Sequence, residues 1–203
     1  MHTETVGEQH NMSDVIGNLG DIPDLSDILG DTDTPTSTPF EDGWYVGTIL
    51  GERRFTDSNG NERVFESGDA VSARGDSRNV KLQVKIKREV DGRELNTSAL
   101  INYNPTDFSQ ETLQAVAKRR EESKDNGGQM GDLFRPFMTI TRVAKLQKIA
   151  GVRAFRRNSE GGLDLTPLYN KTGYFRLSPD DRNPQYKQIA DFRADAPKKA
   201  KVL

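Results

Sequence analysis

A strict alternation of apolar and polar residues over positions 80–87 constrains the fold of this chain more than any other feature of its sequence. Successive side chains of a β-strand point to opposite faces, so the pattern predicts a strand with one buried and one solvated face. Asp91-Gly92 follows, and residues 94–103 come after it as a second strand-like segment. Asp-Gly between two such segments is a strong signal for a β-hairpin. The solvated face of the first strand carries Lys81, Lys85 and Lys87.

The residues upstream predict a second hairpin. Residues 43–55 are expected to form one strand, Asn59-Gly60 a type I′ turn, and residues 63–67 the returning strand. A loop rich in glycine, serine and aspartate then leads to the lysine-bearing strand, and residues 94–103 complete a three-stranded meander. The two hairpins together predict an antiparallel sheet.

Two helices are expected after these strands. Residues 107–123 predict the first helix, with Asp107 or Ser109 as its N-cap. A second helix is expected from about Pro136 to Gly151, although residues 137–141 also fit a strand. The apolar stripe of the first helix consists of Leu113, Val116 and Ala117.

The chain then returns to strand-like sequence over residues 152–157, 163–169, 172–178 and 185–192. Strands, then helices, then strands again predict a β-rich α+β fold. We expect a small curled antiparallel sheet, or an OB-type barrel, with one or two helices.

Residues 1–39 differ from the rest of the chain in composition. They hold eight of the 31 acidic residues, none of the 29 lysines and arginines and no aromatic residue, so their formal charge is −8 and that of residues 40–203 is +6. This predicts a disordered acidic tail, a folded domain over about 40–197 whose basic surface would meet an anion, and a short basic end over 198–203. Residues 14–31 mix aspartates with aliphatic residues, as in segments that fold onto a partner's basic groove; a solvated leader with incidental aliphatic residues is the alternative. The candidate partner-binding residues are Ile16, Leu19, Ile22, Leu25, Ile28 and Leu29.

Several classes of chemistry are excluded. The chain has no cysteine, and His2 and His10 lie in the tail, so residues 40–203 contain no thiolate or imidazole to act as ligand or catalyst. Nucleophile-elbow, P-loop and dinucleotide-binding motifs are missing as well. A carboxylate–metal nuclease around Pro179-Asp180, or unrecognised carboxylate or lysine chemistry, remains as the enzyme alternative. We expect no enzyme, no metal and no cofactor.

The chain has no feature of a membrane or secreted protein. No segment approaches the roughly 18 apolar residues that a membrane-spanning helix needs. The N-terminal residues lack the basic and apolar regions of a secretory signal. We therefore expect a cytoplasmic protein with no membrane partner.

Basic and aromatic residues interleave at several places in residues 40–203, and this pattern is typical of proteins that bind single-stranded nucleic acid. Cations neutralise phosphates, and exposed aromatic rings stack on bases. Each group also has an ordinary explanation, since the phenylalanines can belong to the core and the lysines can lie on a solvated face. The candidate nucleic-acid-binding residues are Trp44, Arg53, Arg54, Phe55, Arg63, Phe65, Lys81, Lys85, Lys87, Tyr103, Arg153, Phe155, Arg156 and Arg157.

Three stretches of the chain resemble a phage protein family from replication and recombination gene clusters. They are FEDGWYVGTI, NVKLQVKIKREVDGRELNTSALINYNP and LDLTPLYNKTGYFRLSPDD, joined by RVAKLQKIAGV and PQYKQIADFRADAP in the later part, and the resemblance covers about residues 40–197. It implies an OB fold that binds single-stranded DNA, with no catalytic residues, in the cytoplasm of a bacterial host.

The partners expected on this hypothesis are single-stranded DNA and, through the acidic tail, replication or recombination proteins. Binding would be independent of sequence and would combine phosphate neutralisation with base stacking. The alternative is a protein-interaction module (an adaptor, host-takeover or virion factor) that acts through the acidic-hydrophobic tail.

Overall fold

The computed structural model describes residues 39–123, 129–180, 183–184 and 186–198. The chain divides into two units, Met1–Pro39 and Phe40–Leu203. The predicted disorder of the tail and its partner-binding residues lie outside the described residues, as do residues 199–203 of the basic C-terminal end.

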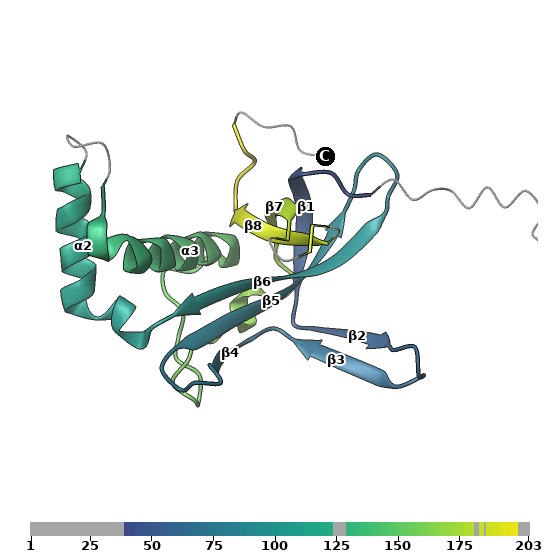
Figure 1. Ribbon diagram of the computed structural model, residues 1–203, viewed down its shortest axis with the longest axis horizontal. Coiled ribbons are helices and arrows are strands. Elements are labelled where there is room, and N and C mark those ends of the chain that lie inside the picture. Colours follow the sequence, from purple (N-terminus) through teal and green to yellow (C-terminus); the bar gives the residue numbers. More distant parts are fainter. Residues whose placement is uncertain (1–38, 124–128, 181–182, 185, 199–203) are drawn as a thin grey trace, which may run out of the picture. The chain divides into compact units, whose positions relative to one another are not determined.

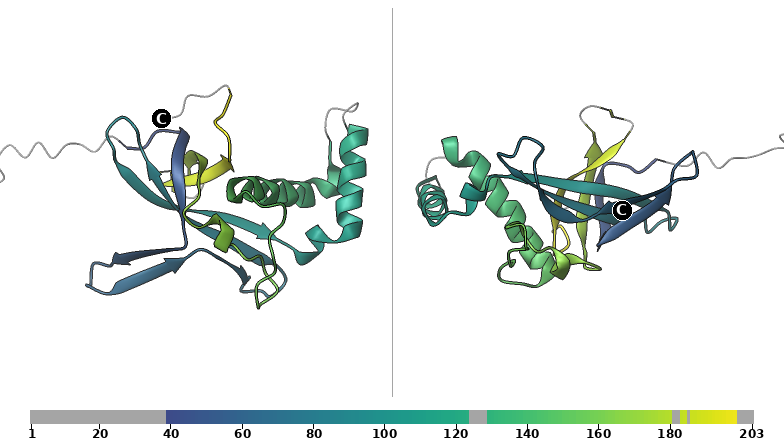
Figure 2. Two further views of the ribbon diagram at one scale, coloured as in Figure 1. Left: turned by 180° about the vertical axis from the view of Figure 1, so that it is seen from behind. Right: turned by 90° about the horizontal axis from the view of Figure 1, so that it is seen from below.

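The unit Phe40–Leu203 is built on a curled antiparallel sheet, with two helices at one end of it (Figures 1 and 2). Five strands follow one another in the order β4-β5-β1-β7-β8, and β6 pairs with the other edge of β5. This confirms the prediction of a β-rich fold with a curled antiparallel sheet and two helices. The strands are β1 (Gly43–Leu50), β4 (Gly68–Val71), β5 (Arg78–Lys87), β6 (Glu94–Tyr103), β7 (Thr172–Pro179) and β8 (Lys187–Arg193).

The central strand β5 explains how the rest of the sheet is connected. Its whole length pairs with β6, while its other edge is shared: residues 83–87 pair with β1, and residues 78–81 pair with β4. Because β1 and β4 follow each other along one edge, the intervening chain must leave the sheet. It does so as a separate hairpin of β2 (Glu52–Thr56) and β3 (Glu62–Glu66), which projects from the sheet in Figure 1.

The sheet curls because β1 pairs with β7, β7 pairs with β8, and β8 comes back beside β6. Thr97 of β6 donates a hydrogen bond from its hydroxyl to the carbonyl oxygen of Lys187 in β8, at 3.5 Å. The bend requires a small residue at Gly47, where a Cβ atom would lie 2.8 Å from Phe175 and 3.1 Å from Val84. Glycine at this position therefore lets the ring of Phe175 pack inside the curl.

The core lies inside the curled sheet, between the strands and the second helix. The apolar side chains of β5 at positions 80, 82, 84 and 86 are all buried, as the alternation predicts. Val143, Leu146 and Ile149 of the helix α3 (Phe134–Ala150) belong to the same cluster. Burial of such aliphatic side chains supplies roughly 1.5–3 kcal/mol each toward folding.

Both helices form close to the predicted positions. The helix α2 (Gln110–Ser123) is capped by Ser109, whose hydroxyl oxygen accepts a hydrogen bond from the amide of Thr112 at 3.1 Å. A single 3₁₀ turn, η2 (Pro105–Phe108), precedes α2, and another, η3 (Gly131–Leu133), precedes α3. The helix α3 ends at Gly151, which takes the left-handed φ of 72°. Residues 137–141 are helical, so the strand alternative for them is wrong.

The predicted apolar stripe of α2 is buried at one position and exposed at the others. Val116 is buried, whereas Leu113 and Ala117 are exposed. The stripe therefore covers little of the core and leaves apolar surface between α2 and α3.

The first hairpin differs in detail from the prediction. Residues 43–55 form two strands separated at Gly51. Residues 62–66 pair with the second of these strands, β2, which confirms the hairpin, but the β2–β3 pair forms a separate two-stranded sheet. The turn is a five-residue loop over 57–61, in which Gly60 has a positive φ and Asn59 does not, so the type I′ prediction is wrong. The carboxylate of Asp57 accepts hydrogen bonds from the amides of residues 59 and 61, and these local bonds favour the wider loop.

Residues 152–169, predicted to contain two strands, form a loop with one isolated bridge, Arg157 to Leu163, and the 3₁₀ turn η4 (Thr166–Leu168). Local side-chain bonds again compete with strand formation, because the amide oxygen of Asn158 accepts from the amides of Glu160 and Gly162. The later predicted strands are confirmed as β7 and β8. In the described part of the chain, neither helix is long and apolar enough to cross a membrane.

Candidate nucleic-acid interface

The outward face of β5 is less solvated than its lysines suggest. Gln83 lies on it between Lys81 and Lys85 and is only 1% exposed, and neither polar atom of its amide has a hydrogen-bond partner among the described residues. Lys81 is half-buried, Lys85 forms an ion pair with Glu94 at 2.9 Å, and Lys87 is exposed. The prediction of a uniformly wet lysine face is therefore wrong, since other parts of the chain cover its middle.

The register of the β2–β3 hairpin places four of the predicted binding residues on one face. Arg53 pairs with Phe65, and Phe55 pairs with Arg63, so these side chains point to the same side. Arg54 points to the opposite side, where it forms ion pairs with two glutamates of the same hairpin. The structure thus separates Arg54 from the other four. The face they share carries two arginines and two phenylalanines, so it is both basic and aromatic.

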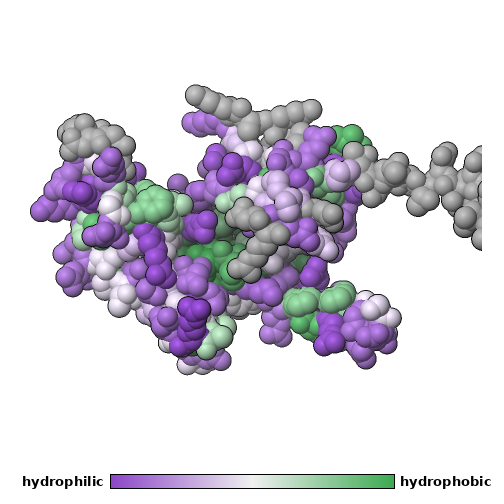
Figure 3. Space-filling view, in the orientation of Figure 1, coloured by the Kyte–Doolittle hydropathy of each residue, from purple (hydrophilic) through white to green (hydrophobic). Residues whose placement is uncertain are grey.

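The two phenylalanines form an aromatic platform on this face, in which Phe55 is exposed and Phe65 is half-buried. The rings of Phe55 and Phe65 are stacked, with 5.2 Å between centroids and 4° between planes, and Phe55 is 40% exposed. Figure 3 shows hydrophobic surface gathered on the hairpin at a distance from the other apolar patches. Exposed, flat rings of this kind are the surfaces on which nucleic-acid bases stack.

Cations from two strands lie against the same rings. The guanidinium carbon of Arg53 is 5.7 Å from the centroid of Phe55 and 5.1 Å from that of Phe65, and the ammonium of Lys81 is 5.0 Å from Phe65. Arg53 also donates to the carbonyl oxygen of Asn96 in β6, at 3.4 Å. These contacts tie the hairpin to the outward face of β5 and β6, and they hold positive charge beside the platform.

The outer end of the hairpin is fixed by Asp57. Its carboxylate forms an ion pair with Arg63 at 3.1 Å. Hydrogen bonds from the backbone amide of Asn61, and then from Arg63 and Asn59, hold the pKa of Asp57 below its usual range. The loop that presents the platform is therefore internally bonded.

Two predicted stacking residues are removed from the candidate surface by burial. Trp44 is 8% exposed and is covered by Arg193, whose guanidinium carbon lies 4.4 Å from the ring. Tyr103 is fully buried, its hydroxyl donates to the carboxylate of Asp69, and burial raises its pKa. Neither ring offers a face to a base.

The segment of Arg153, Phe155, Arg156 and Arg157 lies on the other side of the sheet. Phe155 packs against the core, and the predicted strand that would align the arginines is absent. The loop is held beside β4 because the amide of Leu163, a core residue, donates to Asp69 at 2.6 Å. The three arginines are exposed, but the structure does not bring them to the hairpin.

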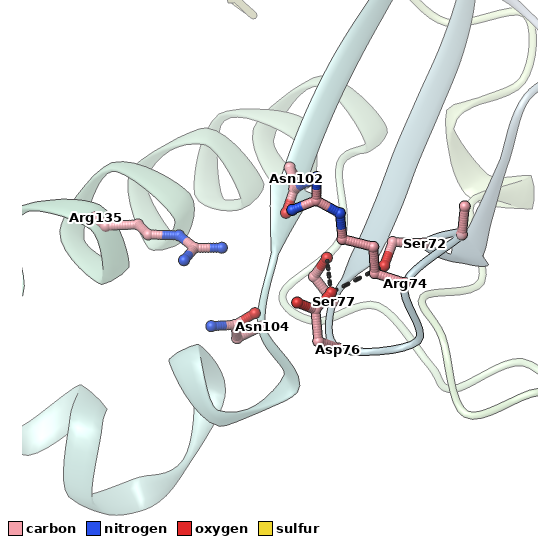
Figure 4. A pocket seen from close by; sticks show the side chains of 8 residues that line it. Ser72, Arg74, Asp76, Ser77, Asn102, Asn104 and Arg135 are labelled. Atoms are coloured by element: carbon pink, nitrogen blue, oxygen red, sulfur yellow. Dashed lines mark hydrogen bonds between the residues drawn. The ribbon is translucent and has the colours of Figure 1, made fainter.

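A polar pocket at the end of β6 went unrecognised in the sequence. It has a volume of about 510 Å³ and is formed by the β4–β5 loop, the end of β6 and the start of α3 (Figure 4). No sequence signal marks it, because Arg135 is far along the chain from the other residues. Its lining residues are Ser72, Ala73, Arg74, Asp76, Ser77, Asn102, Asn104 and Arg135.

The acidic residue at the centre of the nuclease alternative lies in a turn. The carboxylate of Asp180, the centre of the nuclease alternative, accepts a hydrogen bond from the amide of Asn183, as in a turn. Among the described residues, no three histidine, cysteine or acidic side chains lie close enough together to hold a metal ion.

Comparisons with known proteins assign no family to the chain. No protein-family model matches the chain, and no curated protein matches it. The aromatic platform with its cations is therefore the strongest indication of function.

Proposed function

We propose that the chain is a single-stranded-DNA-binding protein of the OB type that binds without sequence preference. The observation that carries the proposal is the stacked pair of the exposed Phe55 and the half-buried Phe65 on a projecting hairpin, flanked by Arg53 and Lys81. Rings supply stacking to any base, and cations supply attraction to any phosphate. Neither interaction depends on the identity of the base, so sequence discrimination is not expected.

The strand connections support the OB assignment. With β4 and the hairpin set aside, five strands remain, and the helices lie between the third (β6) and the fourth (β7). The first strand, β1, pairs with the second and the fourth, and the third lies next to the fifth. A five-stranded, partly open Greek-key barrel has this connectivity.

The place of the aromatic platform supports the same proposal. In OB folds, oligonucleotides bind on the face of the second and third strands, beside the loops that join strands one to two and four to five. In this chain the second and third strands are β5 and β6, and the β2–β3 hairpin belongs to the connection between β1 and β5. The platform thus lies where an OB fold would use it.

The proposed mechanism is passive. Bases stack on Phe55 and Phe65, while Arg53, Arg63 and Lys81 neutralise neighbouring phosphates. The bound strand is kept from re-pairing and is available to replication or recombination proteins, in line with the resemblance to phage proteins from such gene clusters. No cofactor takes part.

A direct test uses the anisotropy of fluorescently labelled oligothymidylate at two salt concentrations. The double variant Phe55→Ala/Phe65→Ala is expected to lose about 1–3 kcal/mol of binding free energy per stacked base. The matched control is Val64→Ala, which changes an exposed side chain on the opposite face of the same hairpin. Quenching of Trp44 is unsuited as a readout, because that ring is buried.

Three results would overturn the proposal. The first is equal affinity of the protein for duplex and single strand, and the second is equal affinity of the double variant and the control for oligothymidylate. The third is a binding constant that does not change with salt concentration, since each phosphate that the protein neutralises adds about 0.7 to the salt slope of single-strand binding.

One observation favours a second candidate function, protein interaction. The groove between α2 and α3, of about 460 Å³, is lined by apolar residues with Arg120, Lys145 and Lys148 and by no acidic residue. An acidic amphipathic helix of a partner protein has the chemistry that fits it. A synthetic acidic amphipathic peptide should bind the wild-type chain and fail to bind Leu113→Glu, whose affinity for DNA stays unchanged.

A further inference from the structure

The polar pocket at the end of β6 carries positive charge that no acidic side chain of the described residues neutralises. Arg74 comes from the β4–β5 loop and Arg135 from the first turn of α3, and both side chains are exposed. Neither forms an ion pair with a described residue. Two arginines that line one cavity and have no carboxylate partner form a site that suits an anion.

The single acid of the pocket is turned toward its own loop. The carboxylate of Asp76 accepts hydrogen bonds from the hydroxyls of Ser72 and Ser77, each at 3.2 Å. Figure 4 shows these bonds on the loop side, while Arg135 and Asn104 lie across the pocket. The carboxylate is thus bound by hydroxyl donors, and the arginines and the amides of Asn102 and Asn104 remain to meet an anion.

The pocket continues the surface that carries the aromatic platform. Lys81 pairs with Leu100, and two residues further along the same strands Asn79 pairs with Asn102. These residues share the outward face, because side chains two apart on a strand point the same way. The pocket therefore begins about 7 Å beyond Lys81 along the strands.

We infer that this pocket binds a backbone phosphate of the same single strand whose bases stack on Phe55 and Phe65. The inference rests on the proposed function and adds a second contact point for the DNA. The bound DNA strand would run from the hairpin along the outward face of β5 and β6 to Arg74 and Arg135. The guanidinium groups donate charge-assisted hydrogen bonds to the phosphate oxygens, and the amides of Asn102 and Asn104 donate to the remaining oxygens. A phosphate fits this donor set, since it offers several acceptor oxygens to donors from different directions.

The test compares oligothymidylates of about 4, 8 and 16 nucleotides, which span the site sizes of OB folds. In the full-length protein, Arg74→Gln/Arg135→Gln should weaken binding of the longer oligomers and lower the salt slope by about 0.7 for the one phosphate. The shortest oligomer, held by the hairpin, should bind as before. Lys118→Gln/Arg119→Gln on α2 is the matched control, because it removes the same charge.

A conservative variant separates charge from geometry. Arg74→Lys/Arg135→Lys keeps the charge and loses the planar fork, so it should keep the salt slope and still weaken binding of the longer oligomers. Circular dichroism of each variant checks that the fold is intact.

The outcomes distinguish this inference from the proposed function. If Phe55→Ala/Phe65→Ala loses binding and the arginine variant behaves like its control at every length, the pocket is no phosphate site and the proposed function stands. If the wild-type protein binds no oligothymidylate, both fall. Binding of a polyglutamate peptide that depends on Arg74 and Arg135, with unchanged affinity for DNA, would overturn the inference in favour of an acidic protein partner.

Discussion

Two regions of the molecule place arginine beside an aromatic ring, and they use the pair in opposite ways. On the β2–β3 hairpin, Arg53 lies against Phe65 at the surface. At the start of β5, Arg78 is buried: its Nε donates to a carboxylate oxygen of Asp69 at 2.9 Å, and Tyr103 donates to the other oxygen of the same carboxylate. Similar residue types thus form an exposed platform on the hairpin and a buried polar cluster of Asp69, Arg78 and Tyr103 in the interior, which is called the junction below.

The two regions differ in their exposure to solvent. The Asp69 carboxylate is wholly buried and also accepts the amide of Leu163, so it joins β4, β5, β6 and the loop after α3. A buried charge needs every one of its partners, whereas exposed charges interact weakly with each other and stay available to a ligand. We therefore expect changes at the junction to affect folding, and changes on the hairpin to affect binding.

The largest effect is expected for Asp69→Ala. It leaves the guanidinium of Arg78 buried without its counter-charge and removes the acceptor of the Tyr103 hydroxyl. Loss of one partner of a buried ion pair costs about 3–5 kcal/mol, and this should appear as a lower midpoint in urea unfolding. An exposed pair gives the control: Glu52→Ala, which removes one of the two ion pairs of Arg54, should cost less than about 1 kcal/mol. Equal losses in the two variants would contradict the distinction.

A smaller effect is expected for Gly162→Ala in the same junction. A Cβ atom there would lie 2.3 Å from an Nη atom of Arg78 and 2.8 Å from the carboxylate carbon of Asp69. Forcing these groups apart should cost about 1–3 kcal/mol in urea unfolding. Gly68→Ala is the matched control, because a Cβ on that β4 residue meets nothing within 4 Å. A loss at Gly68 as large as at Gly162 would contradict this, because alanine at an open position lowers the entropy of the unfolded chain and should not destabilise the fold.

Phe55→Ala should have the reverse profile. Its ring is exposed, so thermal unfolding should shift little, whereas oligothymidylate affinity should fall roughly 5- to 150-fold, the equivalent of one stacked base. This result would show that the hairpin serves binding more than stability. A variant that unfolds at a much lower temperature and binds DNA normally would show the opposite.

The two regions also differ in how far sequence reasoning could reach. The β5–β6 hairpin was predictable, because alternation over 80–87 and Asp91-Gly92 are local signals. The junction was not, since Asp69 lies nine residues from Arg78, 34 from Tyr103 and 94 from Leu163, and only the fold brings them together. On the candidate site, the sequence indicated that the hairpin residues come from neighbouring strands. Their shared face was not predictable, because the predicted type I′ turn would pair Phe55 with Val64, whereas the five-residue loop pairs Phe55 with Arg63. The pocket depends on a helix residue distant in sequence.

The Arg88–Asp91 pair at the β5–β6 turn lies between the two regions in exposure, and it should have the smallest effect. Both oxygens of the Asp91 carboxylate bind the Arg88 guanidinium, and this holds the pKa of Asp91 at about 2. Because the pKa in the unfolded chain is higher, the pair stabilises the fold above about pH 4, and this contribution is lost as the pH falls toward 2. Unfolding midpoints of the wild type and Asp91→Asn should therefore differ at pH 6 and converge near pH 2. A difference that persists at pH 2 would mean that Asp91 acts through the turn geometry and not through its charge.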